Sequence, residues 1–228
     1  ANIMKISLIK FLYLLCFYTF KKYSPLRIYQ ILETSKLQTD GKILDLGSSN
    51  SSNNILKYNS SIKNIRFADK FSKNDEVLSI DLEIFPNKIS GTFKYIFLFN
   101  VMEHIKNFDN CLKNVFCMLE NGGKLIGSVP FLFRVHPSPN DYLRFTDQFL
   151  IEKFKEIGFK NVKVDVLIGG IFISFYSNIF TLLNKIPLFF VINIPFLLIC
   201  LFLDKILNLL SKNYKKNYPI GYYFITEK

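Results

Sequence analysis

The stretch ILDLGSSNSSNN, residues 43–54, decides the fold of this chain. An apolar segment runs into a glycine, a turn of serines and asparagines follows, and the segment ILKY comes next. This pattern is typical of a β-strand that enters a cofactor-binding loop at the edge of a sheet. A nucleotide-binding loop normally contains several glycines, whereas this one has only Gly47. The question is therefore which cofactor a loop of serines and asparagines can hold.

Strands and helices alternate on both sides of this loop. A helix is expected to begin at Ser24, an N-cap residue. A second helix follows residue 104, with Gly122 at its C-terminal left-handed position, and a third runs from Thr146 to Gly158. Seven strands are predicted, at residues 42–46, 64–69, 76–82, 93–100, 124–130, 161–167 and 222–228. The alternation indicates an α/β fold with a doubly wound, mostly parallel sheet.

The composition limits the classes of partner. The 228 residues suffice for one sizeable α/β domain or two small ones. The net charge of +11 predicts attraction to phosphates or anionic lipids, unless it reflects only a lysine-rich composition. Nucleic acid is not expected, because no basic run is interleaved with aromatic residues. The four cysteines are expected to be buried thiols of a cytoplasmic protein, and neither they nor the two histidines have metal-ligand spacing, so no metal site is predicted.

The polar loop disfavours cofactors that contain phosphate. A pyrophosphate site would need glycines at positions 47, 49 and 52, but Ser49 and Ser52 occupy two of them. NAD and FAD are therefore disfavoured, and ATP is too, because no phosphate-loop lysine follows. S-adenosylmethionine has no phosphate, and its methionine end and ribose need one tight glycine, polar side chains and nearby carboxylates.

Carboxylates occur at the ends of three successive strands. Asp45 precedes Gly47, Asp69 ends the second strand and Asp81 ends the third. The carboxyl ends of parallel strands meet at one edge of a sheet, which is where ligands bind. Asp69 could bind the two ribose hydroxyls and Asp81 the adenine amino group. The alternative is that Asp45 and Asp81 only cap turns.

Six segments in order carry a family resemblance: ILDLGSSNSS, LSIDLEIFP, NVMEHIKN, MLENGGKLIGSVPF, HPSPNDYLRFT and FKEIGFKNVKV. With them the chain resembles class I S-adenosylmethionine-dependent methyltransferases of the type often associated with bacterial cell-surface glycan biosynthesis. The resemblance implies a Rossmann-like methyltransferase fold and S-adenosylmethionine as cofactor. It implies that the loop at Gly47 holds the methionine end, Asp69 the ribose, and Asp81 with Leu82 the adenine. The full expected cofactor-binding set is Asp45, Gly47, Ser48, Asn50, Asp69, Asp81, Leu82 and Asn100.

The densest polar stretch, HPSPNDYLRFT at 136–146, follows the fifth strand on the same edge. His136 is expected to act as a general base for a hydroxyl acceptor, and Asp141 to orient or share its proton. Arg144 is expected to bind a phosphate or carboxylate of the acceptor. The alternative is a loop clamp in which Asp141 pairs with Arg144. His104 is expected to begin a helix or to line the site rather than to act as a base.

An uncharged segment precedes the last strand. Residues 166–203 carry one charge, Lys185, and lysines follow them and border the apolar N-terminus. We expect an apolar helix at 1–23, a methyltransferase domain at 24–167 and 218–228, and an apolar helical insert at 168–217. The insert is interpreted as a buried core or homodimer surface, an in-plane membrane anchor, or a membrane-spanning hairpin. No removable signal peptide is expected, because Lys10 interrupts the apolar start and no small-residue cleavage site follows.

These inferences predict a cytoplasmic enzyme, peripheral on the inner face of the membrane if the insert meets lipid. It would transfer a methyl group to a small or lipid-linked acceptor, at a sugar hydroxyl in surface-glycan biosynthesis. Two alternatives stay open. The chain could be a catalytically silent assembly or membrane-binding module, which Ser49 suggests because a second glycine is usual there, or a lipid methyltransferase, which the insert suggests.

Overall fold

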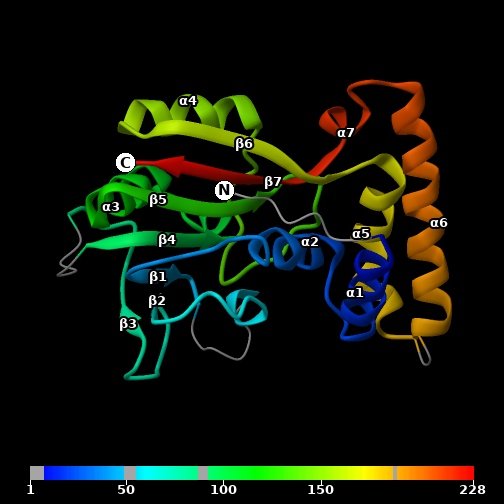
Figure 1. Cartoon of the computed structure of the whole chain (residues 1–228), viewed down its shortest axis with the longest axis horizontal. Coiled ribbons are helices and arrows are strands. Elements are labelled where there is room, and N and C mark those ends of the chain that lie inside the picture. Colours follow the sequence, from blue (N-terminus) through cyan, green and yellow to red (C-terminus); the bar gives the residue numbers. More distant parts are fainter. Residues whose placement is uncertain (1–7, 49–54, 87–91, 187–188) are drawn as a thin grey trace.

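A computed structural model describes residues 8–48, 55–86, 92–186 and 189–228 (Figure 1). Its centre is a seven-stranded sheet with the order β3-β2-β1-β4-β5-β7-β6. Strands β1 to β5 run parallel, and β7 lies antiparallel between β5 and β6. The predicted doubly wound, mostly parallel sheet is confirmed. The strands are β1 Ile43–Leu46, β2 Ile65–Asp69, β3 Leu78–Ser79, β4 Phe93–Phe99, β5 Leu119–Pro130, β6 Lys160–Gly169 and β7 Pro219–Glu227.

Helices cover both faces of the sheet, so its central strands are apolar throughout. Successive residues of a strand point to opposite faces. Ile43 of β1 therefore packs with α2 (Pro25–Thr34), while Leu44 packs in the second core, with α3 (Phe108–Met118) and α4 (Asp147–Ile157). Every residue of β1 is buried. This explains why ILDL and FKYIFLF show no alternation of polar and apolar residues.

The predicted helix caps are present. The Oγ of Ser24 accepts a hydrogen bond from the amide of Arg27 at 3.3 Å, and the Oγ1 of Thr146 accepts one from the amide of Phe149 at 3.3 Å. Gly158 ends α4 with a φ of +110°, a left-handed conformation that glycine adopts without strain. Local sequence therefore determines where these helices begin and end.

Two boundaries differ from the sequence-based prediction. The third strand is only Leu78–Ser79, because it lies at the edge of the sheet and, in the part of the chain that the structure describes, pairs only with β2. The helix α3 ends at Met118, because Leu119 already pairs with Phe93 of β4 as the start of β5. Gly122 does have a positive φ, +75°, but it lies within β5 rather than at the end of the helix.

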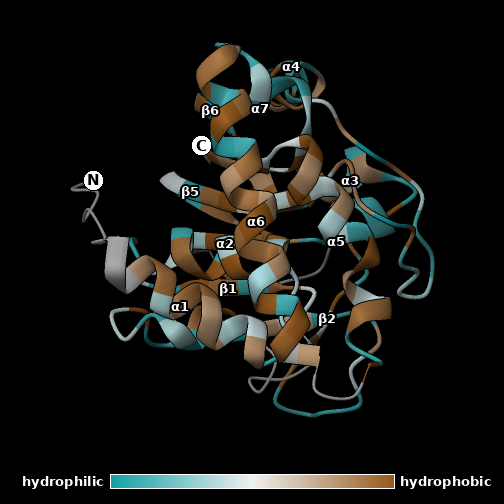
Figure 2. Ribbon diagram, turned by 90° about the vertical axis from the view of Figure 1, so that its right-hand side faces the viewer, coloured by the Kyte–Doolittle hydropathy of each residue, from teal (hydrophilic) through white to brown (hydrophobic). Residues whose placement is uncertain are grey.

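The insert forms three helices after the carboxyl end of β6: α5 Ile171–Leu183, α6 Phe189–Leu210 and α7 Tyr214–Asn217. With α1 (Leu8–Phe20), they form one end of the molecule (Figure 1). One side of this group belongs to the core, where Tyr176, Leu197 and Cys200 are buried. The other side is apolar and open to solvent (Figure 2). The insert therefore has one side packed in the core and one apolar side exposed to solvent.

A buried carboxylate joins the insert together. Asp204 of α6 accepts hydrogen bonds from the amides of Phe172 at 3.1 Å and Ile173 at 2.7 Å, and from the Tyr214 hydroxyl. These amides belong to the first turn of α5, where a negative charge is favourable. Asp204 thus connects α6 to both α5 and α7.

The cysteines differ in part from the expectation of four buried thiols. Cys111 and Cys200 are buried, but Cys117 is exposed and Cys16 is half-buried. The outward position of Cys117 on α3 follows from the helix period: the buried residues Cys111, Leu112, Val115 and Met118 occupy the other side.

Candidate functional site

A cleft of about 480 Å³ opens at the carboxyl edge of the sheet. It lies over the ends of β1, β2 and β4 and is closed on one side by the loop that follows β5. Five of the predicted cofactor residues line it: Gly47, Asp69, Asp81, Leu82 and Asn100. The structure therefore brings together, from four separate segments, side chains that the sequence placed only at strand ends.

Gly47 is the turn by which β1 enters the loop. Its φ is +79°, and a Cβ built there would collide with Cγ2 of Val101. Only glycine satisfies both the backbone angle and the close approach of Val101. Ser48 follows it and is half-buried. Asn50 lies outside the described residues.

Asp45 does not line the cleft. It is 4% exposed and lies in the middle of β1. Burial lowers the pKa of Arg27 on α2, and the Asp45 carboxylate opposes that shift. The structure thus places Asp45 where its charge acts on the half-buried Arg27. Contact of Asp45 with a cofactor stays a prediction.

Asp69 and Asp81 stand at neighbouring strand ends in the cleft. The Oδ1 of Asp69 accepts a hydrogen bond from the amide of Phe71 at 2.7 Å. Asp81 accepts from the amide of Glu83 at 3.0 Å and pairs with Nζ of Lys70 at 2.9 Å. Burial would raise the pKa of Asp81, but Lys70 and the Glu83 amide together hold it below its usual value. Both oxygens of Asp81 therefore have partners already.

Asn100 follows β4 and is held by a buried network that sequence reasoning missed. Nε2 of Gln30, on α2, donates to Oδ1 of Asn100 at 2.8 Å and to Oγ of Ser128 at 2.7 Å. The Ser128 hydroxyl also donates to Asn100 Oδ1 at 3.1 Å. Asn100 has a φ of +53°, a conformation that asparagine tolerates. The one signal in the sequence was a glutamine on the buried side of this helix, among Leu26, Ile28 and Ile31.

The loop after β5 is held by a charged pair. Arg144 donates two hydrogen bonds to Asp141, from Nη1 to Oδ1 and from Nη2 to Oδ2 at 2.7 Å. Asp141 also accepts from the amide of His136 at 2.9 Å. Arg144 holds the pKa of Asp141 well below its usual range, which burial alone would raise. This is the geometry of the clamp alternative, and it fixes the position of His136.

His136 and His104 both face a carboxylate that the sequence analysis did not select. Glu103 is fully buried, and its Oε1 lies 3.6 Å from Nε2 of His136 and 3.8 Å from Nε2 of His104. The Glu103 carboxylate raises the pKa of His136, against the opposite effect of burial. A raised pKa favours the imidazolium form, which cannot accept a proton, so the general-base role of His136 is not favoured by its surroundings. The sequence placed Glu103 beside the donor site with His104 but assigned it no role, because it stands at an apparent helix start.

Comparison with known proteins identifies the fold. Neither a protein-family model nor a curated protein sequence matches this chain. Among solved structures, a S-adenosylmethionine-dependent methyltransferase from Archaeoglobus fulgidus aligns over 92% of this chain and 94% of its own, with a TM-score of 0.53 and 13% identity. A possible histamine N-methyltransferase from Thermotoga maritima aligns over 95% and 98%, with a TM-score of 0.52 and 12% identity.

The chain has the class I methyltransferase fold. Two structures of the Haemonchus contortus phosphoethanolamine N-methyltransferase 2 also share this fold, at 15% identity and TM-scores of 0.51 and 0.52. The present chain covers 52% and 60% of their length. One of these two structures contains S-adenosylmethionine and the other contains S-adenosylhomocysteine. In this methyltransferase fold, the cleft of the present chain lies at the carboxyl edge of the sheet, where the sequence analysis predicted it.

Proposed function

We propose that the chain is a S-adenosylmethionine-dependent methyltransferase. The observation that carries the proposal is the joint position of Gly47, Asp69 and Asn100 in one cleft of a methyltransferase fold. Solved structures with this fold contain S-adenosylmethionine or S-adenosylhomocysteine. The residues present fit that cofactor, because the cleft contains a tight glycine turn and carboxylates. A cofactor with phosphates would instead need several glycines and cationic side chains.

Different residues of the chain would bind different parts of the cofactor. The turn at Gly47 would hold the methionine end, Asp69 the ribose hydroxyls, and Asp81 with Leu82 the adenine. Because Asp81 is paired with Lys70 at 2.9 Å, adenine binding would have to displace or share that ammonium. The bound cofactor supplies an activated methyl group, so the protein's main task is alignment of the acceptor and exclusion of water.

The cofactor assignment predicts a specific loss of affinity. Asp69→Ala should weaken binding of S-adenosylmethionine by roughly 10- to 150-fold, since one charge-assisted hydrogen bond contributes about 1.5–3 kcal/mol. Isothermal titration calorimetry measures this. Asp69→Asn should lose less, because its amide oxygen can still accept from Phe71.

The matched control is Asp75→Ala, which removes an exposed carboxylate a few residues further along the chain and should leave the affinity unchanged. Equal affinities of wild type and Asp69→Ala, or no binding by the wild type, would refute the assignment.

For the acceptor we propose a small or lipid-linked molecule methylated at a sugar hydroxyl, as in surface-glycan biosynthesis. The support is the loop after β5, which places His136, Tyr142 and Asn140 beside the cleft. In one neighbour, the Haemonchus enzyme, the small molecule bound with S-adenosylhomocysteine is phosphomonomethylethanolamine. Transfer from labelled cofactor to a panel of sugars, lipid-linked sugars and phospholipids tests the acceptor class, and preference for a phospholipid would favour the lipid methyltransferase alternative.

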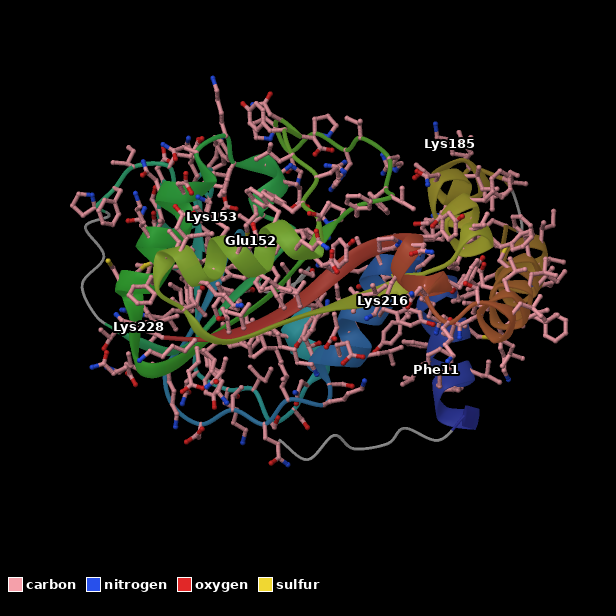
Figure 3. The ribbon with its side chains drawn as sticks, turned by 90° about the horizontal axis from the view of Figure 1, so that it is seen from above. Phe11, Glu152, Lys153, Lys185, Lys216 and Lys228 are labelled. Atoms are coloured by element: carbon pink, nitrogen blue, oxygen red, sulfur yellow. The ribbon has the colours of Figure 1, made fainter. Side chains whose placement is uncertain are left out.

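We further propose that the exposed side of the insert lies against the inner surface of the membrane. Large apolar side chains are exposed on all three long helices at this end, among them Tyr13, Phe175, Ile199, Phe202 and Leu209. Figure 3 shows Phe11 and Lys185 at this end of the molecule. An adjacent groove of about 380 Å³ is lined by Phe11, Leu198 and Phe202, with Lys205 and Lys215. Apolar residues with a lysine rim are what an anionic interface attracts.

The structure favours a helix that lies in the interface over one that crosses it. The segment Val191–Leu210 is long and apolar enough to cross a bilayer, and 22% of it is buried in the protein. Its inner side carries Asn193 and Asp204, which are both buried. A crossing helix would have to remove Asp204 from its three hydrogen-bond donors, which is costly in an apolar medium.

Membrane attachment is tested by flotation. The protein should float with vesicles that contain anionic lipid, and high salt should reduce the floated fraction, because each lysine near such a surface contributes about 1 kcal/mol. Phe202→Ser with Leu209→Ser should reduce flotation further, whereas Ile84→Ser, an equally exposed apolar residue near β3, should not. A protein that stays unbound under all conditions would contradict this proposal.

A further inference from the structure

Three potential metal ligands converge beside the cleft. One ligand atom from each of Glu103, His104 and His136 lies within 4.8 Å of the others. Glu103 and His104 belong to the short helix η3 (Met102–His104), and His136 comes from the loop after β5. His104 also lines the cleft. This juxtaposition requires the folded chain, since the two histidines lie 32 positions apart in the sequence.

The hydrogen bonds of the two imidazoles fix which nitrogen carries hydrogen. Nδ1 of His104 lies 2.6 Å from the carbonyl oxygen of Asn140. Nδ1 of His136 lies 3.2 Å from the carbonyl oxygen of Arg134 and 3.3 Å from Oδ2 of Asp141. These oxygens only accept hydrogen bonds, so both Nδ1 atoms must donate. In a neutral imidazole, Nε2 is then the unprotonated nitrogen, and both Nε2 atoms face Glu103.

Among the described residues, the Glu103 carboxylate has no hydrogen-bond donor. Both of its oxygens are buried, and neither accepts a hydrogen bond from any residue in the described part of the chain. The contacts with the two Nε2 atoms, at 3.6 and 3.8 Å, are longer than hydrogen bonds. Where both imidazoles are neutral, the buried carboxylate faces two nitrogen lone pairs and lacks a positive charge at their centre, which either a proton on His136 or a metal ion would supply.

We propose that Glu103, His104 and His136 bind one divalent transition-metal ion. Two imidazole nitrogens and a carboxylate oxygen suit zinc, manganese, iron or cobalt, and in known catalytic sites such a set leaves coordination positions open. Metal bonds of about 2.1 Å place ligand atoms about 3–3.5 Å apart, so the present separations need only small movements. The sequence analysis predicted no metal site, because two isolated histidines show no ligand spacing.

The surroundings of the histidines match those of metal ligands. A histidine that binds a metal usually donates its other ring hydrogen to a carbonyl or carboxylate, which orients the ring. His104 does so to the carbonyl oxygen of Asn140 and His136 to that of Arg134, with Oδ2 of Asp141 3.3 Å from the same nitrogen of His136. The pair of Asp141 with Arg144 would then hold a ligand of the metal in place rather than contact the acceptor.

The open positions of the ion would be available to an acceptor oxygen at the cleft, a role that rests on the proposed function. A bound cation lowers the pKa of an oxygen that it coordinates. Activation of a hydroxyl acceptor would then come from the ion, and the hydroxyl proton would leave to water in the open cleft instead of to His136. The acceptor oxygen would form its bond to the methyl carbon as the bond from that carbon to the cofactor's sulfur breaks.

Metal binding is tested without cofactor or acceptor. Protein freed of metal by a chelator is titrated with Mn²⁺, followed by electron paramagnetic resonance, and with Co²⁺, followed by visible absorption. The wild type should bind one ion per chain. Loss of a partner of a metal ligand commonly costs about 10- to 100-fold in affinity, so His136→Ala and Glu103→Gln should each cost more than about 100-fold. Cys117→Ser, which removes an exposed thiol on α3, should bind as the wild type does.

Circular dichroism establishes that each variant is folded, and His104→Ala provides a second ligand variant if Glu103→Gln does not fold. The proposal is overturned if the wild type binds no ion at micromolar concentration. It is equally overturned if folded His136→Ala and His104→Ala bind as tightly as the wild type. Because these measurements need no S-adenosylmethionine, a failure of the cofactor assignment would not affect them.

Discussion

The variant His136→Ala should keep its affinity for S-adenosylmethionine and lose methyl transfer by about 10²–10⁴-fold, whether His136 transfers a proton, for which that range is usual, or binds the proposed metal ion that activates the acceptor. The side chain contacts Glu103 and Asp141 in the loop after β5, and His136 is not among the described residues that line the cofactor cleft. Removal of this side chain should therefore reduce methyl transfer to the acceptor and leave cofactor binding unchanged. Calorimetry gives the affinity, and transfer from labelled cofactor gives the rate.

Two variants of the same loop make the result interpretable. Val135→Ala changes an exposed neighbour and should alter neither quantity. Arg144→Ala removes the guanidinium group that donates two hydrogen bonds to Asp141. This variant should reduce transfer less than His136→Ala does, and its cofactor affinity should stay unchanged. If cofactor affinity collapses in folded His136→Ala, the loop is a cofactor lid and the proposed role is wrong.

A chelator separates the two roles that His136 could have. If His136 acts only as a proton acceptor, a chelator should leave wild-type transfer unchanged. If His136 is a metal ligand, the chelator should reduce wild-type transfer to the level of the variant, and added Mn²⁺ or Zn²⁺ should restore it. Neither addition should rescue His136→Ala, because a ligand is missing.

Asp204→Ala should lower the free energy of unfolding by about 3 kcal/mol or more, because each buried donor left without a partner costs about 1–3 kcal/mol. The orphaned donors are the amides of Phe172 and Ile173 and the hydroxyl of Tyr214. For a chain of this size, such a loss corresponds to a fall in melting temperature of roughly 6–12 °C. Urea denaturation and thermal unfolding followed by circular dichroism measure both quantities.

The control for Asp204 is Asp165→Ala, which removes an exposed carboxylate paired with Lys163 at 3.1 Å. Surface ion pairs contribute little, so this variant should stay within about 0.5 kcal/mol of the wild type. Asp204→Asn should be less destabilising than Asp204→Ala, since an amide oxygen still accepts. A stability of Asp204→Ala equal to that of Asp165→Ala would show that the α5–α6 connection is not held by this carboxylate.

The sequence by itself determined the sheet and its ligand edge. The apolar segments of β1 and β4 need cover on both faces, and the caps at Ser24, Thr146 and Gly158 are local, so patterns a few residues long were enough to predict them. Parallel strands end at a common edge by geometry, which is why Gly47 and Asp69 could be placed at one cleft without a structure.

Only the tertiary structure decided which polar side chains meet. The partners of Asn100 are Gln30 and Ser128, which lie 70 and 28 residues away along the chain. The proposed role of Glu103 depends on its contact with His136, and that of Asp204 depends on its hydrogen bonds to the first turn of α5. Such contacts depend on how helices and loops pack across the sheet, and residue spacing within one element carries no information about them. The physical reason is that burial removes water from these groups, so each must find its partner wherever the fold brings one.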